Sequence, residues 1–166
     1  MKTTIGQVVS IQLVVFRLDT FQYGLRLSSV IRVLRAVEVT PLPKAPRIVI
    51  GVINLAGRII PVVNLRRRFG LPERDLQLTD QLIIATTSGG ATTDGGRILA
   101  LVVDDVEGVL DCAAGETLAD AIVPGLEHLH GVARSEEGLI LIHDLDTFLS
   151  LEEDKALSRA LTAGTK

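Results

Sequence analysis

Histidine pairs and acidic side chains are the residues of this chain whose types and spacing could support catalysis or metal binding. His128 and His130 have the H-x-H spacing of two metal ligands, but the nearest acidic residue, Glu127, would point to the opposite face of a strand. A metal site needs a third ligand, so we expect none here. His143 and Asp144 end an apolar run, and we interpret them as a solvent-facing strand terminus that takes no part in chemistry.

The two candidate nucleophiles lack the surroundings that would activate them. Ser88 lies in a loop rich in Gly and Thr, and the chain contains no G-x-S-x-G motif. Cys112 is the single cysteine, so it forms no internal disulfide, and the adjacent Asp111 disfavours a reactive thiolate. We therefore expect a structural cysteine and a chain that is not an enzyme.

Two clusters of charge remain, and neither predicts a catalytic or nucleic-acid site. Asp104 and Asp105 are neighbours on a predicted strand, so their carboxylates point to opposite faces and cannot converge on one substrate. A role at a turn or sheet edge suits them better. Arg66, Arg67 and Arg68 form a basic run without interleaved aromatic residues, which predicts a solvated helical face.

Composition narrows the class of fold and of partner. The chain has 166 residues, of which 47% are hydrophobic and 3% aromatic, so branched aliphatic side chains must build the interior, and these favour strands. A formal charge of −3, from 17 basic and 20 acidic residues, argues against a nucleic-acid or anionic-membrane surface. No apolar run approaches the roughly 20 residues of a membrane-spanning helix, and the N-terminus shows no signal core. A cytosolic chain with a protein partner is expected.

The elements that position these residues are predicted to be short strands with few helices. Apolar runs at 12–18 and 21–27 flank Asp19 and Thr20, which is typical of a β-hairpin. The segment 51–70 contains two apolar strands around an Ala-Gly turn, followed by a short basic helical turn. Further strands are expected within three segments, namely 80–87, 97–112 and 126–145.

Three other segments are predicted to interrupt or follow the strands. A helical turn capped by Ser28 or Ser29 is expected to run into a strand. Three prolines impose an extended loop at 41–46. A charged C-terminal helix or tail is expected at 152–166, with the fold ending near Leu161.

An internal repeat divides the chain into two similar halves. Residues 25–35 and 101–111 align without a gap and begin 76 residues apart. The segments 51–65 and 131–145 have equal lengths and begin 80 residues apart. Two such offsets are typical of a duplicated half-domain whose loops differ in length.

The repeat predicts a mostly β fold. We expect one domain, at 1–161, made of two intertwined five-stranded barrel subdomains at approximately 12–79 and 80–150. Small barrels fill their interiors with side chains, so binding surfaces are expected outside them and at the seam between them. An exposed apolar groove at such a seam is typical of a site for a protein helix.

Four stretches of the sequence together resemble the CheW domain. They are FRLDTFQYGLRLSSVIRVLR, GVINLAGRIIPVVNLRRRFG, ILALVVDDVEGVL and HGVARSEEGLILIHDLDTFL. The most specific is the string from Gly51 to Phe69, and the resemblance covers roughly residues 10–150.

This resemblance implies a fold and a function. It implies two pseudo-symmetric SH3-like barrels and a non-enzymatic adaptor that couples chemoreceptors (methyl-accepting chemotaxis proteins) to a CheA-type histidine kinase. The implied partners are the receptor signalling tip and the kinase regulatory domain, with weak self-association and no cofactor or metal. The implied location is cytoplasmic, at receptor arrays on the inner face of the membrane.

Two binding surfaces follow from the same resemblance. In the family, the receptor hairpin packs in an apolar groove between the subdomains, and the matching positions are Val30, Ile53, Ala100, Val103, Val106 and Val109. Because strand residues alternate faces, each of them is equally open to the interpretation of a plain core residue. Kinase contact uses the barrel ends, where the candidates are Arg58, Ile59 and Leu65.

The chain departs from the family pattern at three positions. Ala56 stands where arginine is common, Asn64 where aspartate is usual, and Arg32 where that arginine often has an acidic partner. These departures indicate a divergent member, and they leave open a kinase-binding or ligand-binding module without receptor coupling. A third hypothesis, a hydrolase on a small barrel, would be supported if replacing His143 abolished an activity.

Overall fold

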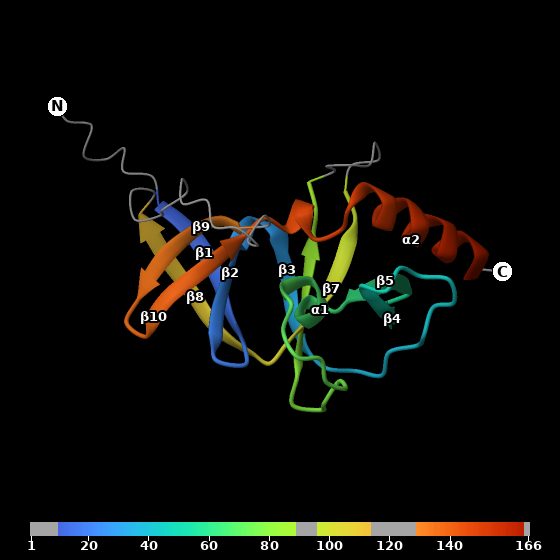
Figure 1. The fold of residues 1–166 in the computed structure, drawn as a ribbon, viewed down its shortest axis with the longest axis horizontal. Coiled ribbons are helices and arrows are strands. Elements are labelled where there is room, and N and C mark those ends of the chain that lie inside the picture. Colours follow the sequence, from blue (N-terminus) through green and yellow to red (C-terminus); the bar gives the residue numbers. More distant parts are fainter. Residues whose placement is uncertain (1–9, 89–95, 114–128, 165–166) are drawn as a thin grey trace.

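Two five-stranded sheets lie side by side along the long axis of the molecule (Figure 1). The computed structural model describes residues 10–88, 96–113 and 129–164. Sheet A has the order β8 (Asp105–Ala113), β1 (Ser10–Leu18), β2 (Phe21–Arg26), β10 (Gly138–His143) and β9 (Leu129–Ser135). Sheet B has the order β3 (Val30–Arg35), β6 (Gln81–Thr86), β7 (Ile98–Val103), β5 (Arg58–Val63) and β4 (Val49–Leu55). The predicted mostly β fold class is confirmed.

The central strands contain consecutive apolar residues because each of them faces two cores. On β1, Leu13 and Val15 belong to a cluster inside sheet A, whereas Phe16 belongs to a cluster that both sheets share. The equivalent strand β6 likewise divides its residues, with Leu82 inside sheet B and Ile83 in the shared cluster. We call the shared cluster and the contacts around it the seam. Alternation on a strand therefore separates two buried faces here, not core from solvent.

The internal repeat reveals how the strands are exchanged between the sheets. It matches β2 and β3 with β7 and β8, and β4 and β5 with β9 and β10. With this correspondence the two strand orders become identical, and each sheet combines the first two strands of one half with the last three of the other. The expected division at 12–79 and 80–150 is therefore not the division into sheets. The chain crosses to the other sheet after β2 and again after β7.

Short helices follow the strands at equivalent places in the two halves. Helix α1 (Leu65–Phe69) begins after Asn64, whose side chain accepts a hydrogen bond from the Arg67 amide, and ends at Gly70 in the left-handed conformation. The 3₁₀ turn η4 (Leu145–Thr147) begins after Asp144, which caps it through the amide of residue 146. In both α1 and η4, the side chain that precedes the first helical residue thus satisfies a free backbone amide.

Two further helices complete the fold. The 3₁₀ turn η2 (Leu27–Ser29) precedes β3, but its capping residue is Arg26 and it makes no side-chain cap, so the predicted serine cap is wrong. The serines lie inside the turn and cannot precede it. Helix α2 (Leu151–Gly164) covers the sheet B end of the molecule, with Leu157 buried in the seam cluster. In the part of the chain that the structure describes, no helix is long and apolar enough to cross a membrane.

Candidate functional site

A stack of aromatic rings lies at the seam. His143, at the end of β10, lies 4.4 Å from Phe69 of α1 between ring centroids, and Tyr23 of β2 lies 4.7 Å from the same phenylalanine. Phe148 packs edge-on against Phe69, with the two rings nearly perpendicular, and also lies against His143. His143 is only 4% exposed, so the predicted solvent-facing terminus is wrong. The helical turns that follow β5 and β10 cover it, and their position depends on the tertiary fold.

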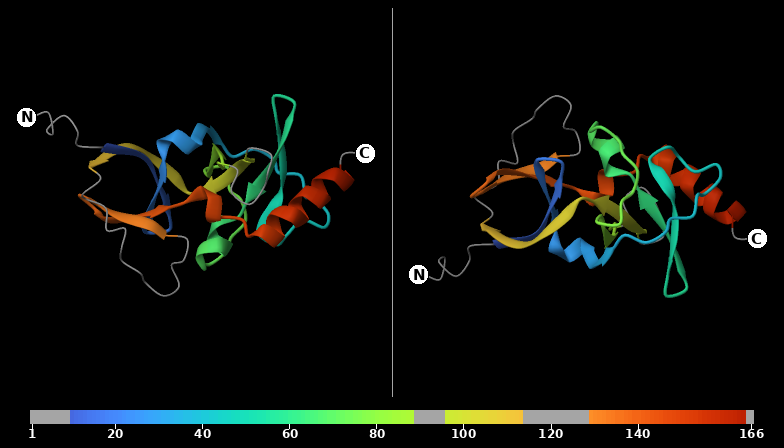
Figure 2. Two further views of the ribbon diagram at one scale, coloured as in Figure 1. Left: turned by 90° about the horizontal axis from the view of Figure 1, so that it is seen from above. Right: turned by 90° about the horizontal axis from the view of Figure 1, so that it is seen from below.

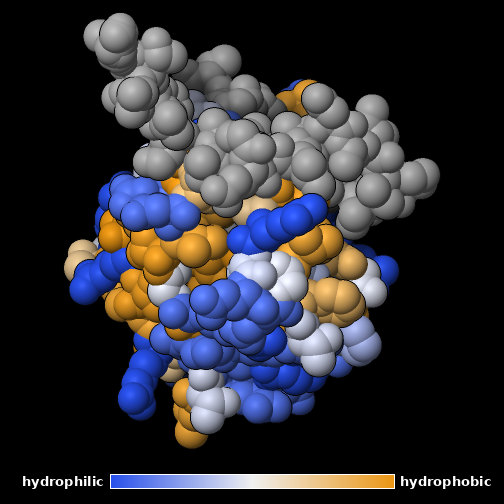
Figure 3. Space-filling view, turned by 90° about the vertical axis from the view of Figure 1, so that its left-hand side faces the viewer, coloured by the Kyte–Doolittle hydropathy of each residue, from blue (hydrophilic) through white to orange (hydrophobic). Residues whose placement is uncertain are grey.

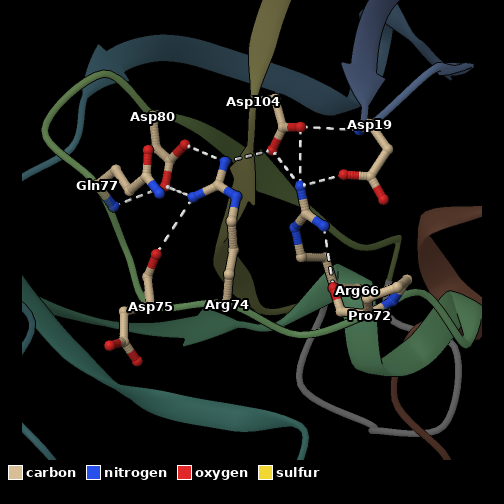
Figure 4. A network of polar contacts seen from close by, with 8 residues as sticks. All are labelled: Asp19, Arg66, Pro72, Arg74, Asp75, Gln77, Asp80 and Asp104. Carbon is tan, nitrogen blue, oxygen red and sulfur yellow. Dashed lines mark hydrogen bonds and ion pairs between the residues drawn. The ribbon is translucent and has the colours of Figure 1, made fainter.

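A network of ion pairs joins the two sheets beside this stack (Figure 4). At its centre, one nitrogen of Arg66 lies 2.8 Å from a carboxylate oxygen of Asp19 and 2.8 and 2.9 Å from the two oxygens of Asp104. Another nitrogen of Arg66 donates to the Pro72 carbonyl at 3.0 Å. The backbone amide of Asp19 also donates to Asp104, at 2.8 Å. Arg66 is buried, so the predicted solvated face is wrong for this member of the basic run.

A second arginine extends the network along the segment between α1 and β6. One nitrogen of Arg74 contacts both Asp80 and Asp104 at 2.7 Å, and another contacts Asp80 at 3.0 Å. Asp80 is almost fully buried and also accepts a hydrogen bond from the Gln77 amide at 2.8 Å. Such two-pronged guanidinium contacts fix orientation as well as distance.

The surroundings of the network shift three pKa values. Burial opposes ionisation of Asp104, but the Asp19 amide and the two guanidinium groups outweigh it and hold the pKa of this carboxyl below its usual range. Burial likewise lowers the pKa of Arg66, and its hydrogen bonds to the two carboxylates more than reverse the effect. Burial and the nearby carboxylate of Asp19 raise the pKa of Tyr23 to about 12. Asp104 and Arg66 therefore carry opposite charges at neutral pH.

A separate polar cluster ties the two edges of sheet A together. Glu107 of edge strand β8 accepts hydrogen bonds from Arg17 at 2.6 Å and from Gln22 at 2.7 Å. Gln22 in turn accepts from the hydroxyl of Ser135 on the opposite edge strand, β9, and Arg17 reaches Glu137 at 3.0 Å. This cluster stabilises one end of sheet A without involving sheet B.

The structure divides the predicted receptor-binding positions into two groups. Ile53, Ala100 and Val103 are buried in the hydrophobic core, so their side chains cannot meet a partner and their assignment to an open groove is wrong. Val30 and Val106 are half-buried against the seam cluster, one on each sheet. Val109 is 56% exposed on β8. We call Val30, Val106 and Val109 the seam-edge valines.

The predicted kinase-binding positions are divided in the same way. Arg58 and Ile59 are exposed on the β4–β5 hairpin, which extends beyond the rest of sheet B (Figure 2). Leu65 is fully buried at the start of α1, so its assignment to an outer surface is wrong. The repeat places Leu139 at the position equivalent to Ile59, and both are about half exposed, at 56% and 48%. The outer face at the sheet A end carries apolar areas among hydrophilic ones (Figure 3).

The three departures from the family pattern occupy different environments. Ala56 and Gly57 form the two-residue turn between β4 and β5, both with positive φ, at 50° and 85°. The Asn54 side chain accepts a hydrogen bond from the Gly57 amide and closes this turn. Asn64 caps α1, a task that asparagine performs as well as aspartate. Arg32 is exposed on edge strand β3.

The candidate catalytic residues do not assemble around one point. Ser88 donates through its amide and its hydroxyl to Asp146 at the surface, and Cys112 is buried in the interior of sheet A. His128 lies outside the described residues, and so does the side chain of His130. Within the described ranges, no three His, Cys, Asp or Glu side chains are placed to hold a metal ion.

A polar cavity bears on the alternative of ligand binding. It measures about 510 Å³ beside α1 and the start of β4, and its lining includes Arg67, Arg74 and Glu73. These charges are already paired: Arg67 lies 2.5 Å from Glu73, and Arg74 belongs to the ion network. Two of the arginines that line the cavity are therefore already paired, and the third lining arginine is Arg47.

The sequence patterns did not predict the ion network. Its members come from the β1–β2 turn, from α1, from the following segment and from the β7–β8 connection, so no spacing along the chain unites them. The one available indication was that Asp104 and Arg66 both lie within the strings that resemble the CheW domain, where Asp104 was expected at a turn or edge. That expectation is consistent with its place between β7 and β8.

Comparisons with known proteins point to one family. A family model described as the CheW-like domain matches residues 12–153. The chain is 29% identical to a chemotaxis protein CheW of Treponema pallidum (strain Nichols), over 89% of this chain and 86% of the relative. It is 28% identical to the protein FrzA of Myxococcus xanthus, over 87% and 88% respectively. The crystal structure of the scaffolding protein TtCheW from Thermoanaerobacter tengcongensis matches with a TM-score of 0.75 and 28% identity, over 87% of this chain and 91% of the other.

Proposed function

The chain belongs to the CheW-like domain family, and on that premise we propose that it is a non-enzymatic adaptor that couples chemoreceptors to a CheA-type histidine kinase in a bacterial chemosensory array. The observation that carries this proposal is the family match, which spans both sheets from residue 12 to residue 153. Its action would be linked binding: by holding receptor and kinase in one geometry, it transmits a change in one to the other.

The seam-edge valines are the proposed receptor-binding surface. They are apolar, they remain at least partly exposed, and they lie on both sheets. A receptor helix laid along them would bury apolar area from each sheet at once. Through such binding the chain would reach receptor arrays at the inner face of the membrane.

The β4–β5 hairpin is the proposed surface for the kinase regulatory domain. Ile59 supplies an exposed apolar side chain and Arg58 an adjacent charge. The hairpin belongs to sheet B alone, so this contact is expected to be independent of the seam-edge valines.

Binding assays with purified partners test both surfaces. The receptor signalling fragment and the kinase regulatory domain from the same genome are titrated with the wild type, Val109→Glu, Leu139→Glu and Ile59→Glu. We expect Val109→Glu to weaken receptor binding by about tenfold and Ile59→Glu to weaken kinase binding by about as much. Leu139→Glu is the matched control for receptor binding, because Leu139 is equally exposed on the same sheet.

The outcome also separates the alternatives. Wild-type binding to the kinase domain but not to the receptor would indicate a regulatory module without receptor coupling. If the wild type binds neither partner, the resemblance to adaptors is one of fold alone.

A further inference from the structure

The ion network lies where the chain passes between the sheets. Asp19 forms the turn of the β1–β2 hairpin in sheet A, and Asp104 connects β7 of sheet B to β8 of sheet A. Arg66 extends from α1, which follows β5 of sheet B. A single guanidinium group therefore holds one carboxylate from a turn of sheet A and one from the crossing itself (Figure 4).

The geometry of these contacts restricts rotation. Arg66 binds both oxygens of Asp104, and Asp104 also accepts the amide hydrogen of Asp19, so the turn and the crossing are fastened to the same carboxylate. Arg74 then connects Asp104 to the buried Asp80 at the start of β6. The second terminal nitrogen of Arg66 is held by Pro72, and Arg74 holds Asp80 with two nitrogens, so both planar groups tolerate little angular change.

At the equivalent junction in the other half, the described residues show no guanidinium between carboxylates. The repeat places Asp146 of η4 at the position of Arg66, and there Asp146 accepts two hydrogen bonds from Ser88 at the surface. A neutral, exposed partner restricts orientation less than a buried guanidinium with three carboxylate contacts. Among the described residues, the buried ion pairs between the sheets thus lie at one of the two equivalent junctions.

We propose that the Arg66–Asp104 pair is an orientation lock, which sets the angle between sheet A and sheet B, and that Arg66 is a positioning residue for the seam-edge valines. Val30 is carried by sheet B and Val106 by sheet A, so their separation depends on that angle. A rigid partner that contacts both valines can bind only at one angle between the sheets. The lock itself depends only on the described contacts, whereas its role in partner binding rests on the proposed function.

Distance measurements between spin labels test the lock without any partner. Labels are placed at Arg35→Cys on β3 and Arg134→Cys on β9, both exposed and on different sheets, with Cys112→Ala as background. Arg66→Gln is expected to broaden the distance distribution about twofold, because the sheets then sample several angles. Arg67→Gln is the matched control: it lies on the same helix, and its exposed pair with Glu73 lies outside the network.

Circular dichroism melting establishes that each variant is folded. Should Arg66→Gln fail to fold, Arg66→Lys tests the same point, since it keeps the charge but loses the second guanidinium nitrogen, which donates to the Pro72 carbonyl while the first contacts the carboxylates. A folded Arg66 variant whose distance distribution matches that of Arg67→Gln overturns the lock.

Affinity for the receptor fragment tests the positioning role. We expect Arg66→Gln to weaken receptor binding about tenfold and to leave binding of the kinase domain unchanged, because the β4–β5 hairpin belongs to one sheet. A broadened distribution with unchanged receptor affinity would overturn the positioning role and retain the lock. If the wild type binds no receptor fragment, the proposed function fails, and the distance result alone decides on the lock.

Discussion

The two junctions beside α1 and η4 have the same backbone plan and different side-chain chemistry. Leu65 and Leu145 are buried at equivalent positions, and the residue before each of them caps the turn through its side chain. One position later the charge is reversed: Arg66 is buried among carboxylates, whereas Asp146 accepts hydrogen bonds from Ser88. The two halves share this backbone plan, but among the described residues only the α1 junction places a buried guanidinium between carboxylates.

The difference is energetic as well as geometric. A buried contact between a guanidinium and carboxylates is stronger than a hydrogen bond from the neutral Ser88 to a surface carboxylate, where water competes. Removing Arg66 also takes the guanidinium partner from Asp19, whereas Asp104 keeps Arg74. At the exposed junction, water replaces a lost contact.

The largest expected effect is the loss of Arg66. Arg66→Met should lower the free energy of unfolding by about 2 to 3 kcal/mol, less than for a fully buried pair, because Asp104 keeps Arg74 and both carboxylates are partly exposed. Asp146→Ala, at the equivalent junction, should cost no more than about 1 kcal/mol. Urea denaturation of the two variants measures both values, and equal losses would remove the distinction between the junctions.

Acid should weaken the α1 junction specifically. The pKa of Asp104 is depressed in the folded chain, so its contribution to stability is present above the ordinary pKa of about 4 and is lost as the pH falls through the lower folded value. We expect Asp104→Asn to have a lower stability at neutral pH and a flatter decline below about pH 4. Denaturation at several pH values gives the two curves. If the stability curves of the wild type and Asp104→Asn stay parallel below about pH 4, Asp104 does not cause the loss of stability in acid.

The smallest expected effect concerns the β4–β5 turn. Ala56 adopts a positive φ of 50°, which costs a residue with a side chain more than it costs asparagine. Ala56→Asn should therefore raise the free energy of unfolding by about 0.5 kcal/mol. Thermal and urea unfolding measure the gain, and the Ile59 surface should bind the kinase domain as before. A loss of stability would indicate that this turn differs from the two-residue type that favours Asn-Gly.

The strands, the first hairpin and α1 were predictable because their causes are local. Apolar runs ending at turn residues located the strands, and Asp19 and Thr20 do form the turn between β1 and β2. Asn64 and Gly70 supply the two caps of α1. The repeat then indicated two equivalent sheets, since equal segments fold into equal elements.

The division of residues between core and surface was less predictable. Ile53, Ala100 and Val103 look like Val109 in sequence, but only Val109 is exposed. Each central strand buries one face in its own sheet and the other in the seam, so alternation does not identify a solvent-facing side. The burial of His143 has the same origin.

By itself, the sequence determined the mostly β class, the duplicated plan, the family resemblance and the short helices, because hydrophobic pattern, repeat and capping residues act over a few neighbours. Only the tertiary structure decided which strands share a sheet, which valines stay exposed and which charges meet at the seam. Those outcomes depend on the exchange of strands between halves, and an ion pair such as Arg66 with Asp104 forms only once that exchange has brought distant segments together.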